Sequence, residues 1–92
     1  MPKFVIERPL PGAGKLSSKE LQGIARKSNE VLDSMAGRAQ WLQTYVTEDK
    51  LFCVYIADDE EAVREHASAG GFPCNAVRRV ATTIDPTTAE VG

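Results

Sequence analysis

Hydrophobic and polar residues alternate along two short stretches of the chain and recur with helical spacing along two others. Side chains of a strand point to opposite faces in turn, so alternation is the pattern of a half-buried strand. The alternating stretches predict strands at residues 3–8 and 40–47. Residues 50–57, rich in aromatic and β-branched residues, predict a third strand, and residues 76–84 are a fourth strand candidate. The two stretches with helical spacing predict helices at residues 17–37 and 58–70.

Start and stop signals support both helices. Ser17 is followed three residues later by Glu20, which is the spacing of a capping box. The acidic run at residues 58–61 places carboxylates where the helix dipole favours negative charge, and it is interpreted as a solvated helix start. Gly37 and Gly71 stand where a helix ends, since glycine readily adopts the left-handed conformation found there.

The order strand, helix, strand, strand, helix, strand is that of the split βαβ, or ferredoxin-like, arrangement. With right-handed crossovers it gives an α+β fold, a four-stranded antiparallel sheet with both helices on one face. The 92 residues suit a single domain. We expect an ordered core over about residues 2–85 and a loose tail at 86–92.

No predicted helix covers the second face of the sheet. We expect one set of strand residues to face the helices, namely Phe4, Ile6, Leu42, Val46, Phe52, Val54 and Ile56. The residues then left on the open face are aromatic or semi-polar: Val5, Glu7, Trp41, Gln43, Tyr45, Cys53 and Tyr55. An exposed apolar patch of this kind suits a subunit interface, a small-molecule pocket or a platform for single-stranded RNA.

Composition narrows these choices. A net charge of −2 and a pI of about 5.3 argue against sequence-independent binding of nucleic acid, so a homodimer is favoured. No apolar run approaches the roughly 20 residues of a membrane helix, and the first residues do not form a signal peptide. We therefore expect no membrane partner and a cytoplasmic location, with Cys53 and Cys74 as reduced thiols.

His66 is the one histidine of the chain and the one side chain whose ordinary pKa lies near neutrality. It is either a hydrogen-bonded, half-buried core residue or a functional group, namely a metal ligand or a general base. With Glu61, Glu65 and Asp59 nearby in sequence it has the donor types for a divalent ion, since imidazole suits Ni²⁺, Zn²⁺ and Cu²⁺. No second histidine stands four residues away, which argues against a closed structural zinc site.

The chain resembles the small bacterial nickel-responsive, nickel-binding proteins of ferredoxin-like fold, a family long treated as a domain of unknown function. The resemblance is carried by the segments at residues 2–8, 41–50, 53–57, 61–67 and 71–73. It implies a homodimer that binds Ni²⁺ at its surface and serves in nickel sequestration or detoxification without catalysis. His66, in the matching Glu-His-Ala segment, is the best candidate ligand, and Glu7, Glu61 and Glu65 are chemically suited.

A second hypothesis is a small cofactor-independent enzyme, of monooxygenase or isomerase type, in the dimeric α/β-barrel class. Two open sheet faces would then enclose a pocket containing Glu7, Trp41, Tyr45 and Tyr55, with His66 or Glu7 as the general base. It rests on fold analogy alone, and a fold does not specify a function. Whether the chain is an enzyme is open at this point, with a binding role favoured.

Overall fold

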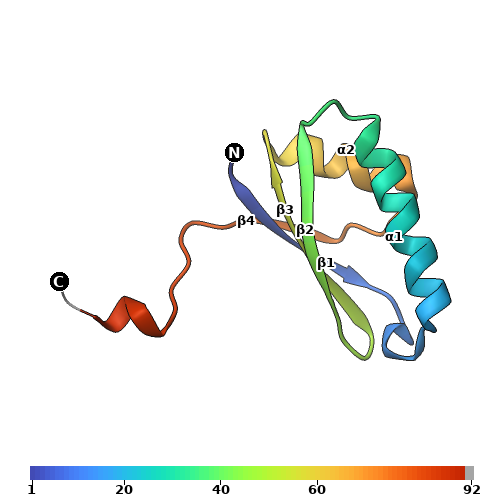
Figure 1. Cartoon of the computed structure of the whole chain (residues 1–92), viewed down its shortest axis with the longest axis horizontal. Coiled ribbons are helices and arrows are strands. Elements are labelled where there is room, and N and C mark those ends of the chain that lie inside the picture. Colours follow the sequence, from blue (N-terminus) through green and yellow to red (C-terminus); the bar gives the residue numbers. More distant parts are fainter. Residues whose placement is uncertain (91–92) are drawn as a thin grey trace.

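A computed structural model describes residues 1–90 and has the elements in the predicted order (Figure 1). The strands are β1 (Lys3–Pro9), β2 (Ala39–Val46), β3 (Lys50–Ala57) and β4 (Ala76–Arg79). The helices are α1 (Ser18–Asp33) and α2 (Glu60–Gly70), with short 3₁₀ turns at Ala13–Lys15 and Pro86–Ala89. The sheet order is β2-β3-β1-β4 and each neighbouring pair is antiparallel, which confirms the α+β ferredoxin-like arrangement.

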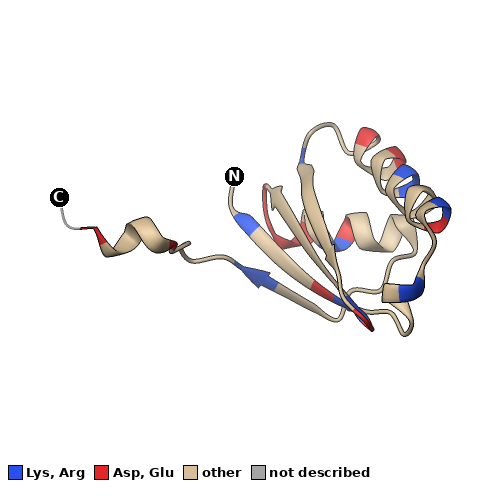
Figure 2. Ribbon diagram, turned by 60° about the horizontal axis from the view of Figure 1, so that its bottom comes forward, with Lys and Arg blue, Asp and Glu red and all other residues tan. Residues whose placement is uncertain are grey.

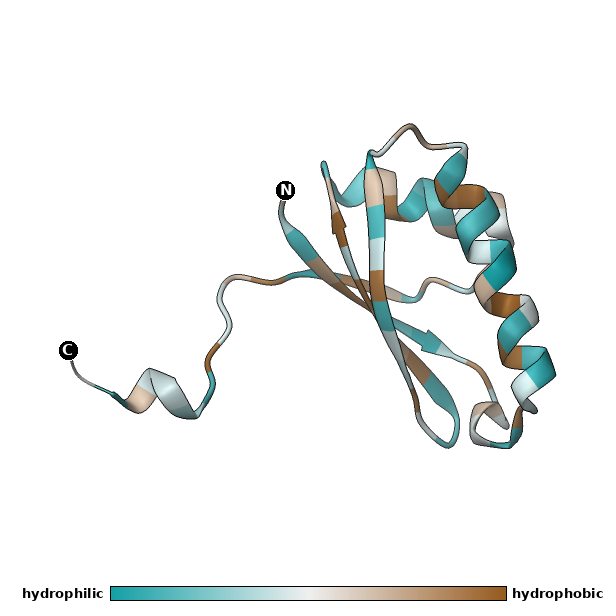
Figure 3. Cartoon of the chain, in the orientation of Figure 1, coloured by the Kyte–Doolittle hydropathy of each residue, from teal (hydrophilic) through white to brown (hydrophobic). Residues whose placement is uncertain are grey.

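Both helices pack on one face of the sheet (Figure 1). Apolar positions recur along each helix between polar ones, so each helix can bury a stripe (Figure 3). The core between the layers consists mainly of Phe4, Ile6, Val31, Met35, Leu51, Cys53, Tyr55, Ala57, Ala62 and Val63. Cys53 lies in this core and Cys74 at its margin, and neither forms a disulfide within residues 1–90.

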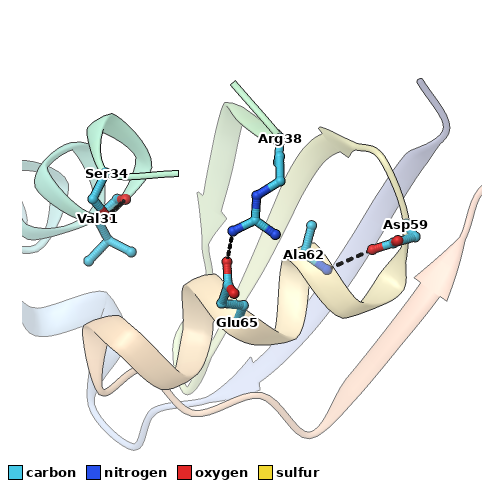
Figure 4. Close-up of polar contacts among 6 residues, drawn as sticks. All are labelled: Val31, Ser34, Arg38, Asp59, Ala62 and Glu65. Atoms are coloured by element: carbon cyan, nitrogen blue, oxygen red, sulfur yellow. Dashed lines mark hydrogen bonds and ion pairs between the residues drawn. The ribbon is translucent and has the colours of Figure 1, made fainter. Parts of the chain in front are cut away.

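The capping box of α1 is confirmed: Ser17 Oγ accepts a hydrogen bond from the Glu20 amide, and Glu20 Oε1 accepts one from the Ser17 amide. The helix ends at Asp33 and not at Gly37, because the chain turns directly after Asp33. The Ser34 hydroxyl donates to the carbonyl of Val31 at 2.6 Å, which binds one of the helix's last carbonyl groups (Figure 4).

The second helix begins one residue later than the acidic run indicated. Asp59, and not Asp58, is the N-cap, because its Oδ1 accepts a hydrogen bond of 2.8 Å from the amide of Ala62 (Figure 4). The helix ends at Gly70, and Gly71 follows with a φ of +69°, the left-handed conformation expected of a glycine in this place.

Strand β4 is shorter than the predicted 76–84, because its neighbour β1 begins at Lys3 and offers no further backbone groups to pair with. The amide of Val80 donates to the carbonyl of Lys3 at the very start of β1, so no partner strand lies beyond it. Residues 81–90 are exposed and lead away from the body of the molecule (Figure 1). Residues 91–92 of the expected loose tail lie outside the described residues. No helix within residues 1–90 combines the length and apolar character needed to cross a membrane.

The predicted division of faces is right for β1 and wrong for β3. In β1, Phe4 and Ile6 are buried under the helices, as expected. In β3 the buried positions are Leu51, Cys53, Tyr55 and Ala57, so Phe52, Val54 and Ile56 lie on the open face. Every residue from 51 to 57 is apolar, and alternation therefore carries no information on which set faces the helices.

A β-bulge explains the error in β2. Trp41 pairs with Tyr55, but Gln43 pairs with the preceding residue Val54, so one extra residue is inserted between them. Trp41 consequently faces the helices, whereas Gln43 and Tyr45 face the open side. Leu42, placed among the core residues by its sequence position, lies at the bulge and is 48% exposed.

Candidate functional site

A cavity of about 190 Å³ lies between α1 and the sheet. Its walls come from both layers and are mostly apolar. The lining residues are Arg8, Leu21, Ile24, Ala25, Ser28, Trp41, Thr44, Val46, Leu51, Cys53, Tyr55 and Phe72. The cavity is therefore on the helix-covered face, not on the open face, for which a pocket was one of the alternatives.

Arg8 is the charged residue of this cavity, and it is only 2% exposed. Its Nη1 donates to the carbonyl of Pro73 at 2.8 Å, and its Nη2 lies 3.5 Å from the hydroxyl of Tyr55. The guanidinium carbon is 5.5 Å from the ring centre of Phe72, within the range of a cation–π contact. No carboxylate within residues 1–90 forms an ion pair with Arg8.

His66 lies beside Arg8 and Phe72 and has no exposed surface, so it is more deeply buried than the half-buried core residue that the sequence offered as one interpretation. Its ring sits between those of Tyr55 and Phe72, with centre distances of 5.2 and 5.6 Å. Nε2 is 3.1 Å from the hydroxyl of Ser28, and Nδ1 has no hydrogen-bond partner within the described chain. Burial lowers the pKa of His66, so the imidazole is neutral at neutral pH.

The three candidate acids do not converge on His66 within residues 1–90. Glu7 is on the open face and binds Lys50 Nζ at 2.8 Å, a contact that lowers the pKa of the carboxyl group. Glu65 pairs with Arg38 on the outer side of α2 (Figure 4), and Glu61 is exposed on the same helix. Acidic residues occur on several elements of the fold rather than on one of them (Figure 2).

One chain therefore does not assemble the proposed metal ligands. Among residues 1–90 no group of three or more histidine, cysteine or acidic side chains is arranged to hold an ion. The identity of the ligands stays a prediction, and any site built from these residues needs donors from a second copy or from water.

The residues expected to form one pocket or interface divide into two sets. Trp41, Cys53 and Tyr55 line the cavity under α1, where the indole N–H of Trp41 donates to the hydroxyl of Thr44. Gln43 and Tyr45 lie on the opposite face of the sheet and hydrogen-bond to each other. The bulge in β2 and the apolar run in β3 are the causes of this division.

Sequence reasoning missed Arg8 and Ser28. A usable signal was present for Arg8, since it continues the alternation of Phe4 and Ile6 along β1 and must share their inward face. A charged residue at an inward position is unusual enough to mark a site. Ser28 gives no such signal, because only the packing of α1 on the sheet places it against His66.

The fold and this cavity together define a small α+β protein of ferredoxin-like topology with a ligand-sized cavity on its helix-covered face. A family model described as nickel responsive protein SCO4226-like matches residues 4–80, and the chain belongs to that family. Its fold is similar to that in the crystal structure of SCO4226 from Streptomyces coelicolor A3(2), with a TM-score of 0.75. That likeness has 14% sequence identity and covers 89% of this chain and 99% of the other. Among proteins with curated descriptions, none matches the chain significantly.

Proposed function

We propose that the chain is a non-catalytic nickel-binding protein that acts as a homodimer and serves in nickel sequestration or detoxification. The observation that carries the proposal is the match of residues 4–80 to a family described as nickel responsive. A cytoplasmic location remains a prediction beside it.

The apolar character of the open sheet face supports the proposal that a second copy of the chain binds there. It carries partly exposed apolar side chains from three strands, namely Val5, Tyr45, Phe52, Val54 and Ile56. A contiguous apolar surface of this kind is typical of an interface. A twofold contact between identical faces is the commonest arrangement for such a pair.

The ligand chemistry also favours two copies, because residues 1–90 of one chain bring no set of three or more donors together. Glu61 and Glu65 are four residues apart on α2 and therefore share an exposed helix face. Glu7 lies on the other side of the sheet, where the second copy is proposed to bind. His66 completes the proposed set by residue type, and local opening of α2 is needed for it to reach an ion.

Titration calorimetry with Ni²⁺ tests the proposal. We expect binding of modest affinity by the wild-type protein, and a loss of most of it in Glu61→Gln/Glu65→Gln, which removes two carboxylate ligands. Glu60→Gln is the matched control, because Glu60 is exposed on the same helix, is ion-paired as Glu65 is, and lies outside the proposed ligand set. Absence of binding heat in the wild-type protein would exclude nickel binding, and unchanged heat in the double variant would exclude this ligand set.

A separate variant tests whether His66 takes part in nickel binding. His66→Gln preserves a polar side chain, and its thermal unfolding shows whether the fold is retained. A folded His66→Gln protein that binds Ni²⁺ like the wild type would remove the imidazole from the site and leave the carboxylates.

The enzyme hypothesis finds no single site in the described chain. It required Glu7, Trp41, Tyr45 and Tyr55 to face one pocket, but Trp41 and Tyr55 lie under α1 and the other two lie on the open face. No observation therefore favours it over binding.

A further inference from the structure

The cavity under α1 combines apolar walls with a buried positive charge that has no acidic partner. Of the described residues that line it, Arg8 alone is charged. Its partners are a neutral carbonyl of Pro73, the hydroxyl of Tyr55 and the ring of Phe72. A charge removed from water is strongly unfavourable unless an opposite charge or good hydrogen bonds compensate it.

The neutral groups beside Arg8 are also disposed to donate hydrogen bonds. His66 Nδ1 has no partner among residues 1–90, and a buried unpaired N–H is rarer than an unpaired acceptor. We therefore assign the proton to Nε2; in this tautomer His66 donates to Ser28 Oγ, and the Ser28 hydroxyl keeps its own proton to donate. Burial raises the pKa of Tyr55, which keeps that hydroxyl protonated as well.

We propose that this cavity binds a small organic monoanion, a carboxylate with an aromatic or branched apolar body, whose head group pairs with Arg8. The planar guanidinium matches a carboxylate in shape, and one positive charge suits one negative charge. Ser28 and Tyr55 supply further donors, and the body of the ligand rests against Leu21 and Ile24 of α1.

The size and position of the cavity are consistent with such a ligand. An apolar cavity of about 150 Å³ accommodates benzene, so a cavity of about 190 Å³ takes a ring with a small substituent. Val46 of the edge strand β2 lines the cavity and is 42% exposed, so a ligand can approach from this edge of the sheet. The site is on the opposite face of the sheet from the proposed subunit contact and does not depend on nickel.

Three probes separate the contributions of head group and body. Benzoate carries both, acetate carries the head group alone, and benzyl alcohol carries the ring without the charge. Trp41 is the single tryptophan and lines the cavity, so its fluorescence reports occupancy, and calorimetry gives the affinity. We expect benzoate to bind at least about tenfold more tightly than either of the other probes, because charged hydrogen bonds and ring burial both contribute.

Variants of the cavity test the role assigned to Arg8. We expect Arg8→Met to lose the preference for benzoate over benzyl alcohol and to remain folded, since an apolar side chain of similar volume is often tolerated in place of a buried charge. Arg78→Met is the matched control, because Arg78 is exposed on β4. Ala25→Phe places a ring in the cavity from α1 and should abolish binding with Arg8 still present.

Each contrary outcome overturns the proposal. Equal affinities for acetate and benzoate would indicate a simple anion site, and equal affinities for benzyl alcohol and benzoate would indicate an uncharged apolar cavity. Absence of benzoate binding at millimolar concentration would show that the cavity holds no carboxylate. Loss of the preference in Arg78→Met, or its retention in folded Arg8→Met, would remove Arg8 from the site.

Discussion

The two faces of the sheet differ in whether other elements of the same chain cover them. On the covered face, β3 contributes Cys53 and Tyr55 to a core that both helices close. On the open face, the same strand contributes Phe52, Val54 and Ile56, and each of these is only partly buried. Because both sets of side chains are apolar, the difference lies in what covers them. Strand β3 thus contributes side chains both to a closed core and to an apolar surface that the chain covers only in part.

The polar groups of the two faces differ as well. The covered face encloses Arg8 and a neutral His66, two groups that are costly to bury unless they are used or well satisfied. The open face carries the Glu7–Lys50 pair, which is partly exposed. Exposed pairs contribute about 0–1 kcal/mol to stability. The covered face is therefore where a polar substitution has large consequences.

The largest expected effect on stability comes from truncating an isoleucine, a substitution that can be made on either face of the sheet. Ile6 is fully buried under the helices and Ile56 is partly exposed on the open face. Ile6→Ala should lower the free energy of unfolding by about 2–5 kcal/mol, because it leaves a cavity in the core. Ile56→Ala should cost less, and its effect should depend on protein concentration if a second copy covers it. Urea unfolding measures both, and equal, concentration-independent losses would contradict the distinction between the faces.

Stability should also depend on pH through His66. Its pKa in the folded state lies below the ordinary 6.5, because burial disfavours the charged ring, and Arg8 opposes it too. The unfolded chain therefore binds the proton first as the pH falls below about 6.5. The contribution of His66 is present above that pH and is lost progressively below it.

Thermal unfolding between about pH 8 and 5 measures this dependence. The melting temperature of the wild-type protein should fall across the range, whereas that of His66→Phe should fall less, since the variant has no group to protonate. Parallel profiles for the two proteins would show that His66 is accessible to protons in the folded state.

A smaller effect concerns the start of α2, which helps to close the covered face. Asp59→Ala should lower the free energy of unfolding by about 1 kcal/mol, because it removes the side chain that accepts from Ala62. Asp58→Ala is the matched control one residue earlier, where the side chain makes no cap, and it should change stability little. The reverse order in chemical denaturation would place the helix start at Asp58.

The smallest effect is expected on the outer side of the same helix. Arg38 and Glu65 form an ion pair there, and both side chains are about half exposed (Figure 4). Arg38→Gln should cost less than about 1 kcal/mol, and the difference from wild type should shrink in high salt. A larger and salt-independent loss would mean that this pair fastens α2 to the sheet.

Much of the fold could be predicted from the chain because local signals agreed with the global arrangement. The order of elements, the capping box at Ser17 and the inward face of β1 all follow from spacing and residue type. The faces of β3 did not follow, since residues 51–57 are apolar throughout. The bulge at Leu42 did not follow either, because it depends on how β2 meets β3.

The site was harder to predict for a physical reason. The donor types for a metal could be named from the sequence, but their distances depend on packing, which buries His66 and leaves Glu61 outside. The cavity exists only where α1 packs on the sheet, so no single segment of the sequence predicts it. Arg8 was predictable as an inward charge, whereas its lack of an acidic partner was not.

The central claim is that the open face is completed by a second copy of the chain. Light scattering on a sizing column measures it directly, with Val54→Lys on the open face and Gln22→Lys on the exposed side of α1 as the control. We predict twice the 10.0 kDa chain mass for the wild type and for Gln22→Lys, and the single-chain mass for Val54→Lys, because a buried lysine would oppose the contact. A wild-type protein of single-chain mass, or a Val54→Lys variant that keeps the doubled mass, would contradict the claim.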